Sequence, residues 1–294
     1  MKKLLTTGCS YTSYYYPTWA DWLGVYFDKH INLGASGSGP RYSYTAVNDF
    51  FRYKKNNPKD YIVVVQWSSL LRHDKRNPET GHWYWGGQID NNTNYNEDYL
   101  KKFYNSIDNA SDLVNYIEHL ILLSEKLGFK LLMTYMFEPW IDSYLGEPVF
   151  AKDICKQNIL EFKKSNYIKS LKDYSKSEYW INPSIESFTL KTPVKNKILL
   201  DYLYLDEWKQ IEEHHPSPYQ HLMYAKLIGK QIYQRLDNSV PLEKRITYAD
   251  NYDSIALELD KYLSIDGNSS LMQKKGLKNS WKYTVKLENI LNYL

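Results

Sequence analysis

Apolar runs of strand length recur along the chain and predict a layered fold. The clearest covers residues 61–66, a β-branched run without polar alternation, which is typical of a strand covered on both faces. Four further runs predict strands at residues 3–8, 30–33, 129–135 and 197–205. The first of these ends at Gly8, at a change from apolar to polar residues.

Helical periodicity fills the intervals between these strands. Trp19, Trp22, Leu23 and Tyr26 have the spacing of one helix face, and residues 41–55 can form another helix before Pro58. Such an alternation of strand and helix predicts an α/β fold, with a parallel sheet and helices on both faces.

Two later helices carry clear boundary signals. Residues 112–127 form an amphipathic stretch that Ser111 can cap and Gly128 can stop. Ser217-Pro218-Tyr219-Gln220 predicts the start of a last helix that extends to about residue 236, since Ser217 fits the N-cap and Gln220 can close a capping box.

Two stretches have no sustained apolar period and are interpreted as insertions, at about 72–110 and 137–195. Residues 1–236 then form one domain, and residues 237–294 form a C-terminal extension of unassigned role. Within the first insertion, the charged run Arg72–Arg76 is expected to be a solvated surface.

Composition excludes several classes of protein. The formal net charge of +3, from 37 basic and 34 acidic residues, gives no electrostatic footprint for a nucleic-acid binder. No apolar run approaches the roughly 20 residues that span a bilayer. Two cysteines cannot form a disulfide framework or a zinc site of cysteine ligands. Leu4-Leu5 is too short for a signal sequence, so the N-terminus is interpreted as the first strand of the fold. Tyrosine, with 29 residues, is unusually frequent.

Candidate chemistry begins where the first strand ends. Gly8-Cys9-Ser10-Tyr11-Thr12 places Ser10 at a predicted strand-to-helix turn, where a nucleophilic hydroxyl stands above the sheet and a helix start stabilises anions. Ser10 could instead be only a helix N-cap. Cys9 is an alternative nucleophile, but it points to the opposite side if the strand continues through it.

A histidine pair precedes the last predicted helix. His215, in His214-His215-Pro216-Ser217, can act as general base towards Ser10, and Glu212, three residues earlier, can orient it. His214 is then the spare neighbour, and His221 is expected to be structural or to face the substrate. The histidines and glutamates of this segment also permit a metal site, but without a recognised ligand spacing. The Gly34–Gly39 segment lacks the order of a phosphate-binding loop, and a plain turn is expected.

Four blocks together resemble the SGNH, or GDSL-like, hydrolases over about residues 1–236. Gly8–Thr12 is similar to the G-D-S-x-T block, Asn32–Gly37 to N-x-G-x-S-G, Tyr61–Ser69 to the strand with G-x-N-D, and His215–Ser217 to D-x-x-H-P. The resemblance implies a three-layer flavodoxin-like fold and ester hydrolysis without metal or cofactor. It makes Ser10, His215 and Glu212 catalytic, and it places the oxyanion hole at Ser10, Gly37 and Ser68.

Three positions depart from the family pattern. Cys9 replaces an Asp, Ser68 stands where the family has the oxyanion-hole Asn, and Glu212 replaces an Asp. Losing one oxyanion donor typically costs about 10²–10³ in rate. Two hypotheses follow: an O-acyl, chiefly O-acetyl, carbohydrate esterase, or a catalytically weak or inactive module that binds glycans or forms part of a virion.

Aromatic residues provide candidate substrate contacts, because flat rings stack on sugars. They are Trp67, Trp83 and Trp85. A loop that buries its own aromatics is the competing interpretation. The expected partner is a small-molecule or glycan ester, with no nucleic acid and no membrane, and an oligomer or virion assembly is open. The expected location is cytoplasmic, or the virion for a phage protein.

Overall fold

The computed structural model describes most of the predicted elements. The described residues are 3–14, 16–53, 56–70, 72–76, 78–81, 83–88, 105–140, 162–189, 199–204, 207–212, 215–235, 252–254 and 256–257. They belong to two compact units that interleave along the chain. The sheet unit comprises Met1–Thr12 and Ile31–Ser187, and the second unit comprises Ser13–His30 and Phe188–Leu294.

A four-stranded sheet organises the sheet unit, in the order β2-β1-β3-β6. The strands are β1 (Lys3–Thr7), β2 (His30–Asn32), β3 (Tyr61–Trp67) and β6 (Lys130–Tyr135). β3 pairs in parallel with β1 and with β6, and all seven of its residues are buried. The predicted α/β fold with a parallel sheet is therefore confirmed.

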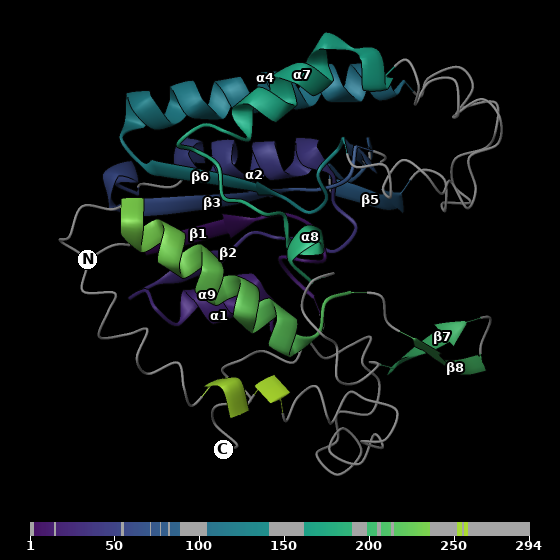
Figure 1. Cartoon of the computed structure of the whole chain (residues 1–294). Helices are drawn as coiled ribbons and strands as arrows, with labels where there is room; N and C mark the ends of the chain where they lie inside the picture. Colours follow the sequence, from purple (N-terminus) through teal and green to yellow (C-terminus); the bar gives the residue numbers. More distant parts are fainter. Residues whose placement is uncertain are drawn as a thin grey trace. The chain divides into compact units, whose positions relative to one another are not determined.

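One face of this sheet is covered by α2 (Pro40–Tyr53) and α4 (Ser106–Leu127), and α7 (Asn166–Tyr174) packs against α4 (Figure 1). The core under these helices is apolar and aromatic. Its fully buried members include Leu5, Val47, Val63, Val65, Trp67, Leu113, Ile117, Leu120 and Met133. Every second residue of β3 faces this layer, as the two-residue period of a strand requires.

The helix predicted at residues 112–127 begins earlier than its sequence signal. Ser106 rather than Asp112 starts α4, because the Oδ1 of Asn105 accepts the Ile107 N–H at 2.8 Å and caps the helix there. Ser111 therefore lies inside the helix. The predicted stop is confirmed: Gly128 has a φ of 81° and its N–H donates to the Ser124 carbonyl at 2.7 Å.

Two antiparallel hairpins lie outside the main sheet. β4 (Arg72–Arg76) pairs with β5 (Trp83–Gln88) inside the stretch expected to be irregular, and β7 (Leu199–Tyr204) pairs with β8 (Glu207–Glu212). The strand predicted at residues 197–205 exists as β7, but its place in the parallel sheet was wrong. An apolar run indicates a strand without indicating its partner, and β8 follows closely enough to pair with it.

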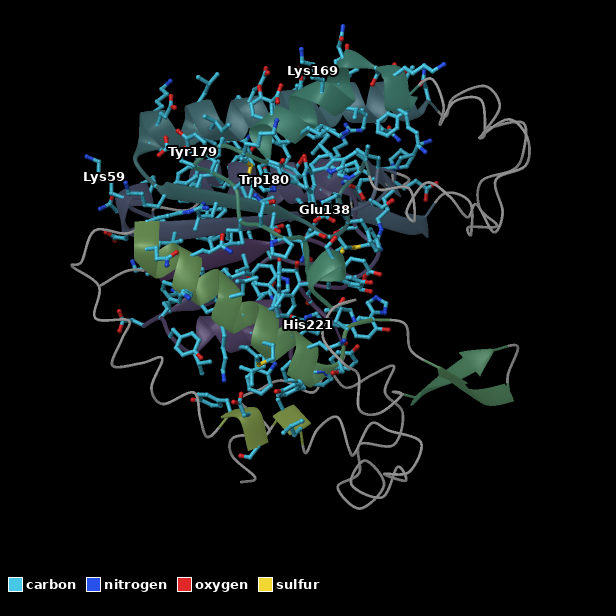
Figure 2. The ribbon with its side chains drawn as sticks, viewed as in Figure 1. Lys59, Glu138, Lys169, Tyr179, Trp180 and His221 are labelled. Carbon is cyan, nitrogen blue, oxygen red and sulfur yellow. The ribbon has the colours of Figure 1, made fainter. Side chains whose placement is uncertain are left out.

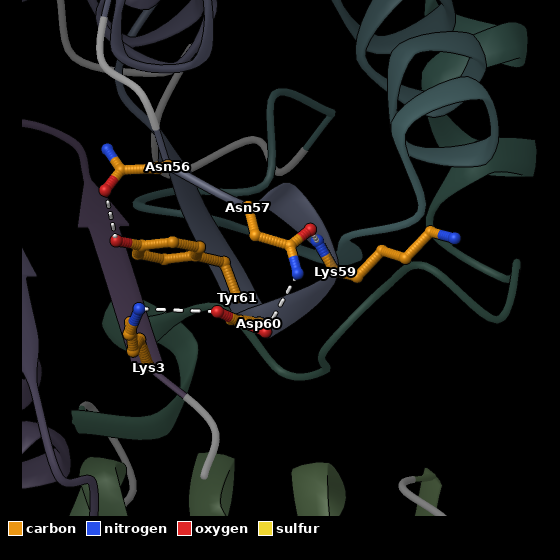
Figure 3. A network of polar contacts seen from close by, with 6 residues as sticks. All are labelled: Lys3, Asn56, Asn57, Lys59, Asp60 and Tyr61. Carbon is orange, nitrogen blue, oxygen red and sulfur yellow. Dashed lines mark hydrogen bonds and ion pairs between the residues drawn. The ribbon is translucent and has the colours of Figure 1, made fainter.

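The amino end of β3 is fastened by polar groups around the short helix η1 (Pro58–Asp60), shown in Figure 3. The Lys3 ammonium lies 3.4 Å from an Asp60 carboxylate oxygen, and the Tyr61 hydroxyl donates to Asn56 at 3.1 Å. The Asn57 side chain accepts the Lys59 N–H at 3.4 Å and donates to Asp60 at 3.3 Å. These contacts lie at the end of the sheet opposite the carboxyl ends of the strands.

Two helices of the second unit pack together: α1 (Trp19–Gly24) and α9 (Pro218–Arg235). Trp19 meets Tyr224 edge to face, with ring centroids 6.5 Å apart. The predicted capping box is confirmed, since the Gln220 N–H donates to Ser217 Oγ at 3.3 Å and the Ser217 N–H donates to Gln220 Oε1 at 2.9 Å.

Among the helices that the structure describes, none is long and apolar enough to cross a membrane.

Candidate active site

Ser10 lies in a closed turn directly after β1. The Thr12 N–H donates to the Cys9 carbonyl at 2.9 Å, and Ser10 is 3% exposed. The turn is tight: a Cβ on Gly8 would lie 2.2 Å from the Thr12 hydroxyl oxygen, so only glycine fits. No helix begins here, because the next one, α1, starts at Trp19. The predicted strand-to-helix turn was therefore wrong, and Ser10 is not a helix N-cap.

Cys9, the alternative nucleophile, is enclosed in the core. Its side chain is fully buried, and its Sγ lies 3.0 Å from the Met136 thioether sulfur. A thiol enclosed against a thioether lacks the electropositive, partly exposed setting of a reactive cysteine. This geometry favours Ser10 over Cys9 as the nucleophile.

Gly37 lies in a second turn that is tied to the first. The Ser38 N–H donates to the Ala35 carbonyl at 3.0 Å, and Gly37 has a φ of 83°, which favours glycine. The Gly8 carbonyl accepts the Ala35 N–H at 2.9 Å and the Ser38 hydroxyl at 3.0 Å. The Gly37 N–H itself makes no hydrogen bond within the part of the chain that the structure describes.

Asn32 joins the two turns, a role that the sequence analysis missed. Its Nδ2 donates to the Thr12 carbonyl at 2.8 Å, and its Oδ1 accepts the Gly34 N–H at 2.9 Å. The signal was available, because Asn32 opens the second of the four blocks. Its side chain sets the spacing between the turn of Ser10 and the segment that leads to Gly37.

Ser68 follows β3, which leaves the sheet beside β1 at the same end. The parallel register pairs Thr7 with Val65, so the segments after both strands emerge together. Ser68 is 5% exposed, and its hydroxyl has no hydrogen-bond partner among the described residues. On the same strand, the Gln66 side-chain oxygen accepts a hydrogen bond from the Thr12 hydroxyl at 2.9 Å. This bond ties the turn of Ser10 to β3.

The three candidate tryptophans have different surroundings. Trp67 is fully buried in the core under α2 and α4, which assigns it to packing. Trp83 lies under the Arg76 guanidinium, 4.6 Å from the ring centroid, and meets Tyr42 edge to face at 5.6 Å. The Trp85 side chain lies outside the described residues.

His215 belongs to the second unit, where aromatic rings hold it. Tyr14 stacks on its imidazole with centroids 4.2 Å apart and an interplanar angle of 20°. Tyr16 donates its hydroxyl to the Pro216 carbonyl at 3.0 Å and so fixes the following residue. Glu212 ends β8, and its side chain lies outside the described residues, as does His214.

His221 is fully buried on the first turn of α9, and its N–H donates to the Ser217 carbonyl at 2.8 Å. Burial, with a smaller contribution from His215, lowers its pKa from 6.5 to about 3. The ring is therefore neutral at physiological pH and suits a place in the core rather than a general base.

Carboxylates surround Tyr11, the residue after Ser10. Its hydroxyl donates to Glu186 at 3.2 Å, and burial raises the pKa of both groups. Nearby, Glu138 accepts the Ser187 hydroxyl at 2.7 Å and the Ser184 N–H at 3.0 Å (Figure 2). Within the described residues, no group of three or more His, Cys, Asp or Glu side chains could hold a metal ion.

Asp74 departs from the solvated state predicted for the charged run Arg72–Arg76, whereas Arg76 is exposed as expected. Asp74 is 4% exposed, and it accepts backbone N–H groups at the start of α2.

The structure places Ser10, Gly37 and Ser68 in the sheet unit, and His215 and Glu212 in the second unit. The pairing of Ser10 with His215 stays a prediction.

Comparison with known proteins finds likeness among solved structures but none at the level of sequence families. No family model matches the sequence, and no curated protein matches it. Among solved structures, the chain is similar to a protein assigned to the G-D-S-L lipolytic family from Desulfitobacterium hafniense DCB-2. The identity is 13% and the TM-score 0.38, and the match covers 79% of this chain and 99% of that chain.

Proposed function

We propose that the chain is a serine esterase that removes an O-acyl group, most simply O-acetyl, from a carbohydrate. The observation that carries the proposal is the Gly37 N–H, which is presented by a left-handed glycine and has no partner among the described residues. That turn shares the Gly8 carbonyl with the turn of Ser10. A tetrahedral oxyanion requires such an N–H, without a partner among the described residues, on a segment that is held to the turn of the serine.

In the proposed mechanism, the Ser10 hydroxyl attacks the ester carbonyl while His215 takes its proton. The negative charge that develops on the carbonyl oxygen is held by the N–H groups of Ser10 and Gly37. The intermediate then collapses, the C–O bond to the sugar breaks, and His215 gives its proton to the departing alcohol. Water, deprotonated by His215, releases the acyl group as a carboxylic acid and restores Ser10. Glu212 orients the imidazole throughout.

Ser68 supplies the third oxyanion donor in this proposal. Its hydroxyl is buried and unpartnered among the described residues, so it can donate one hydrogen bond without first breaking another. A hydroxyl reaches less far than the carboxamide that the resembled family carries here. A slower enzyme than a typical member is therefore expected.

The proposed substrate class rests on the net charge of the chain and on the aromatic residues Trp83, Tyr84 and Trp85 of β5. A net charge of +3 on 294 residues gives no steering towards a strongly charged substrate. An acylated neutral sugar is compatible with that balance and with stacking on tryptophan or tyrosine.

The test is hydrolysis of p-nitrophenyl acetate and of acetylated sugars by the wild type, Ser10→Ala and Ser13→Ala. Ser10→Ala should lose on the order of 10⁴-fold or more in kcat/KM. Ser13→Ala, a nearby serine without a proposed role, should keep wild-type rates. Equal rates for wild type and Ser10→Ala would end the proposal.

A non-catalytic glycan-binding or virion module is the second candidate. It is favoured by three departures from the family pattern, at Cys9 and Glu212 in place of Asp and at Ser68 in place of Asn. A fluorophosphonate probe separates the two candidates, because it labels only an activated serine. Labelling that disappears in Ser10→Ala supports the esterase, whereas no labelling together with sugar binding supports the module.

A further inference from the structure

A buried carboxylate from the β4–β5 hairpin reaches the segment that carries Gly37. Asp74 is 4% exposed, and its two oxygens accept the Gly39 N–H at 2.6 Å and the Tyr42 N–H at 2.7 Å. These are short, charge-assisted hydrogen bonds to the unsatisfied donors at the start of α2. Helices usually find this cap in the residue just before them, whereas here it comes from 35 positions further along the chain.

The same strand also holds the other side of this peptide group. Arg72 Nη1 donates to the Ser38 carbonyl at 3.0 Å, so the carbonyl and the N–H of the Ser38–Gly39 peptide group are both bound by β4. A register shift between Arg72 and Asp74 interrupts the pairing of β4 with β5. Such bulges re-aim side chains, and both residues here meet one turn.

The turn leaves little freedom for a different arrangement. A Cβ on Gly39 would lie 2.8 Å from an Asp74 carboxylate oxygen and 3.0 Å from the Arg72 Cβ. On its other side, the Ser38 hydroxyl binds the Gly8 carbonyl at 3.0 Å, and the Tyr42 hydroxyl binds the Leu33 carbonyl at 3.0 Å. The turn is therefore held from three directions, while the Gly37 N–H has no partner among the described residues.

Keeping a carboxylate at this position is costly. Burial raises the pKa of Asp74, and only the two backbone N–H groups and the charges of Arg72 and Arg41 act against that increase. A neutral side chain could cap α2 at a lower desolvation cost. A carboxylate that accepts two hydrogen bonds holds the turn more rigidly, which offsets this desolvation cost.

We propose that Asp74, assisted by Arg72, is a positioning residue that fixes the Gly37 N–H in the geometry required to bind the oxyanion. This inference rests on the proposed function. The hairpin, which lies between the blocks that resemble the family, would then be a working part of the site. Neither residue touches the substrate in this proposal.

The test compares Asp74→Asn with Asp49→Asn. Asn keeps the shape of Asp74, but it can accept at only one atom and presents an NH₂ group to the second N–H. Asp49 pairs with Arg76 at 3.5 Å on the exposed side of the same helix and hairpin, so its variant controls for their attachment. We expect Asp74→Asn to lower kcat by about 10²-fold, the typical cost of a lost oxyanion donor, with KM within about twofold. Asp49→Asn should keep both constants.

Arg72→Met provides a second variant if Asp74→Asn does not fold. It should lower kcat about tenfold without raising KM, because the hydrogen bond from the guanidinium to the Ser38 carbonyl is lost. An unchanged kcat in a folded Asp74→Asn or Arg72→Met variant would overturn the proposal. So would a loss that appears in KM alone.

Failure of the proposed function can be recognised separately. In that case wild type and Ser10→Ala hydrolyse ester equally, and neither the fluorophosphonate labelling nor the kcat measurements bear on Asp74. Hydrogen exchange at the Ser38 amide, which binds Ala35 and not Asp74, then decides whether Asp74 orders the turn. Faster exchange in Asp74→Asn than in Asp49→Asn supports the ordering role, and equal exchange refutes it.

Discussion

His221 should make the protein sensitive to acid. Its ring is fully buried on α9 (Figure 2), and its pKa falls from 6.5 to about 3, chiefly through burial. In the unfolded chain the same group titrates near its ordinary value of about 6.5. Between these two values the unfolded state binds a proton that the native state does not. Stability present above pH of about 6.5 is therefore lost as the pH falls towards about 3.

The size of the effect follows from the pKa difference. Each pH unit inside this window costs about 1.4 kcal/mol, so His221 alone removes about 2 kcal/mol between pH 8 and pH 5. Domains are typically stable by about 5–15 kcal/mol, so the loss is readily measured. Urea titrations followed by circular dichroism at pH 8, 6, 5 and 4 give the free energy of unfolding for wild type, His221→Gln and His119→Gln.

The expected result is a difference in slope. His221→Gln should lose about 1.4 kcal/mol less stability per pH unit than wild type, which amounts to about 2.5 kcal/mol less between pH 6 and pH 4. His119, exposed on α4, is the matched control, and its variant should keep the wild-type slope. Any packing defect of His221→Gln shifts the whole curve without changing its slope. Parallel losses in wild type and His221→Gln would refute the reasoning.

Three further predictions concern single contacts. Ser217→Ala removes the N-cap that binds Gln220 and should lower the free energy of unfolding by about 1 kcal/mol in urea titrations. Tyr14→Ala removes the stack on His215 and should lower kcat about three- to tenfold, whereas Tyr14→Phe should keep it. Ser68→Ala should lower kcat by on the order of 10²-fold with little change in KM, and wild-type kinetics would remove its hydroxyl from the oxyanion hole.

Elements with short-range causes were predictable from sequence. β3 is set by its own apolar run, and the start of α9 by two residues three positions apart, Ser217 and Gln220. The first residue of α4 was not predictable in the same way, because Asn105 and Ser111 are both good caps. Ala110 and Ile107 pack against the core, and this tertiary burial extends the helix back to Asn105.

Asp74 shows why the rest of the candidate site escaped prediction. In sequence it stands among Arg72, His73, Lys75 and Arg76, where exposure is the reasonable expectation. Its burial depends on the register of a hairpin and on the position of a helix start far away in the chain. Neither is encoded within a short window. Strand β7 has the same cause of error, since its partner β8 determines the sheet to which it belongs.

The tyrosine excess gains a physical role from three contacts. Tyr42 binds the Leu33 carbonyl at the entrance of the Gly37 turn, Tyr16 binds the Pro216 carbonyl beside His215, and Tyr11 binds Glu186 after Ser10. The Tyr42 and Tyr16 hydroxyls satisfy backbone carbonyls of irregular segments, whereas the Tyr11 hydroxyl, itself in the turn of Ser10, binds the side-chain carboxylate of Glu186 on the helix Ile185–Thr189. Phenylalanine would provide the packing but leave that oxygen without this donor. Tyrosine therefore stabilises turns that no regular hydrogen-bond ladder holds, and these are the turns on which the proposed chemistry depends.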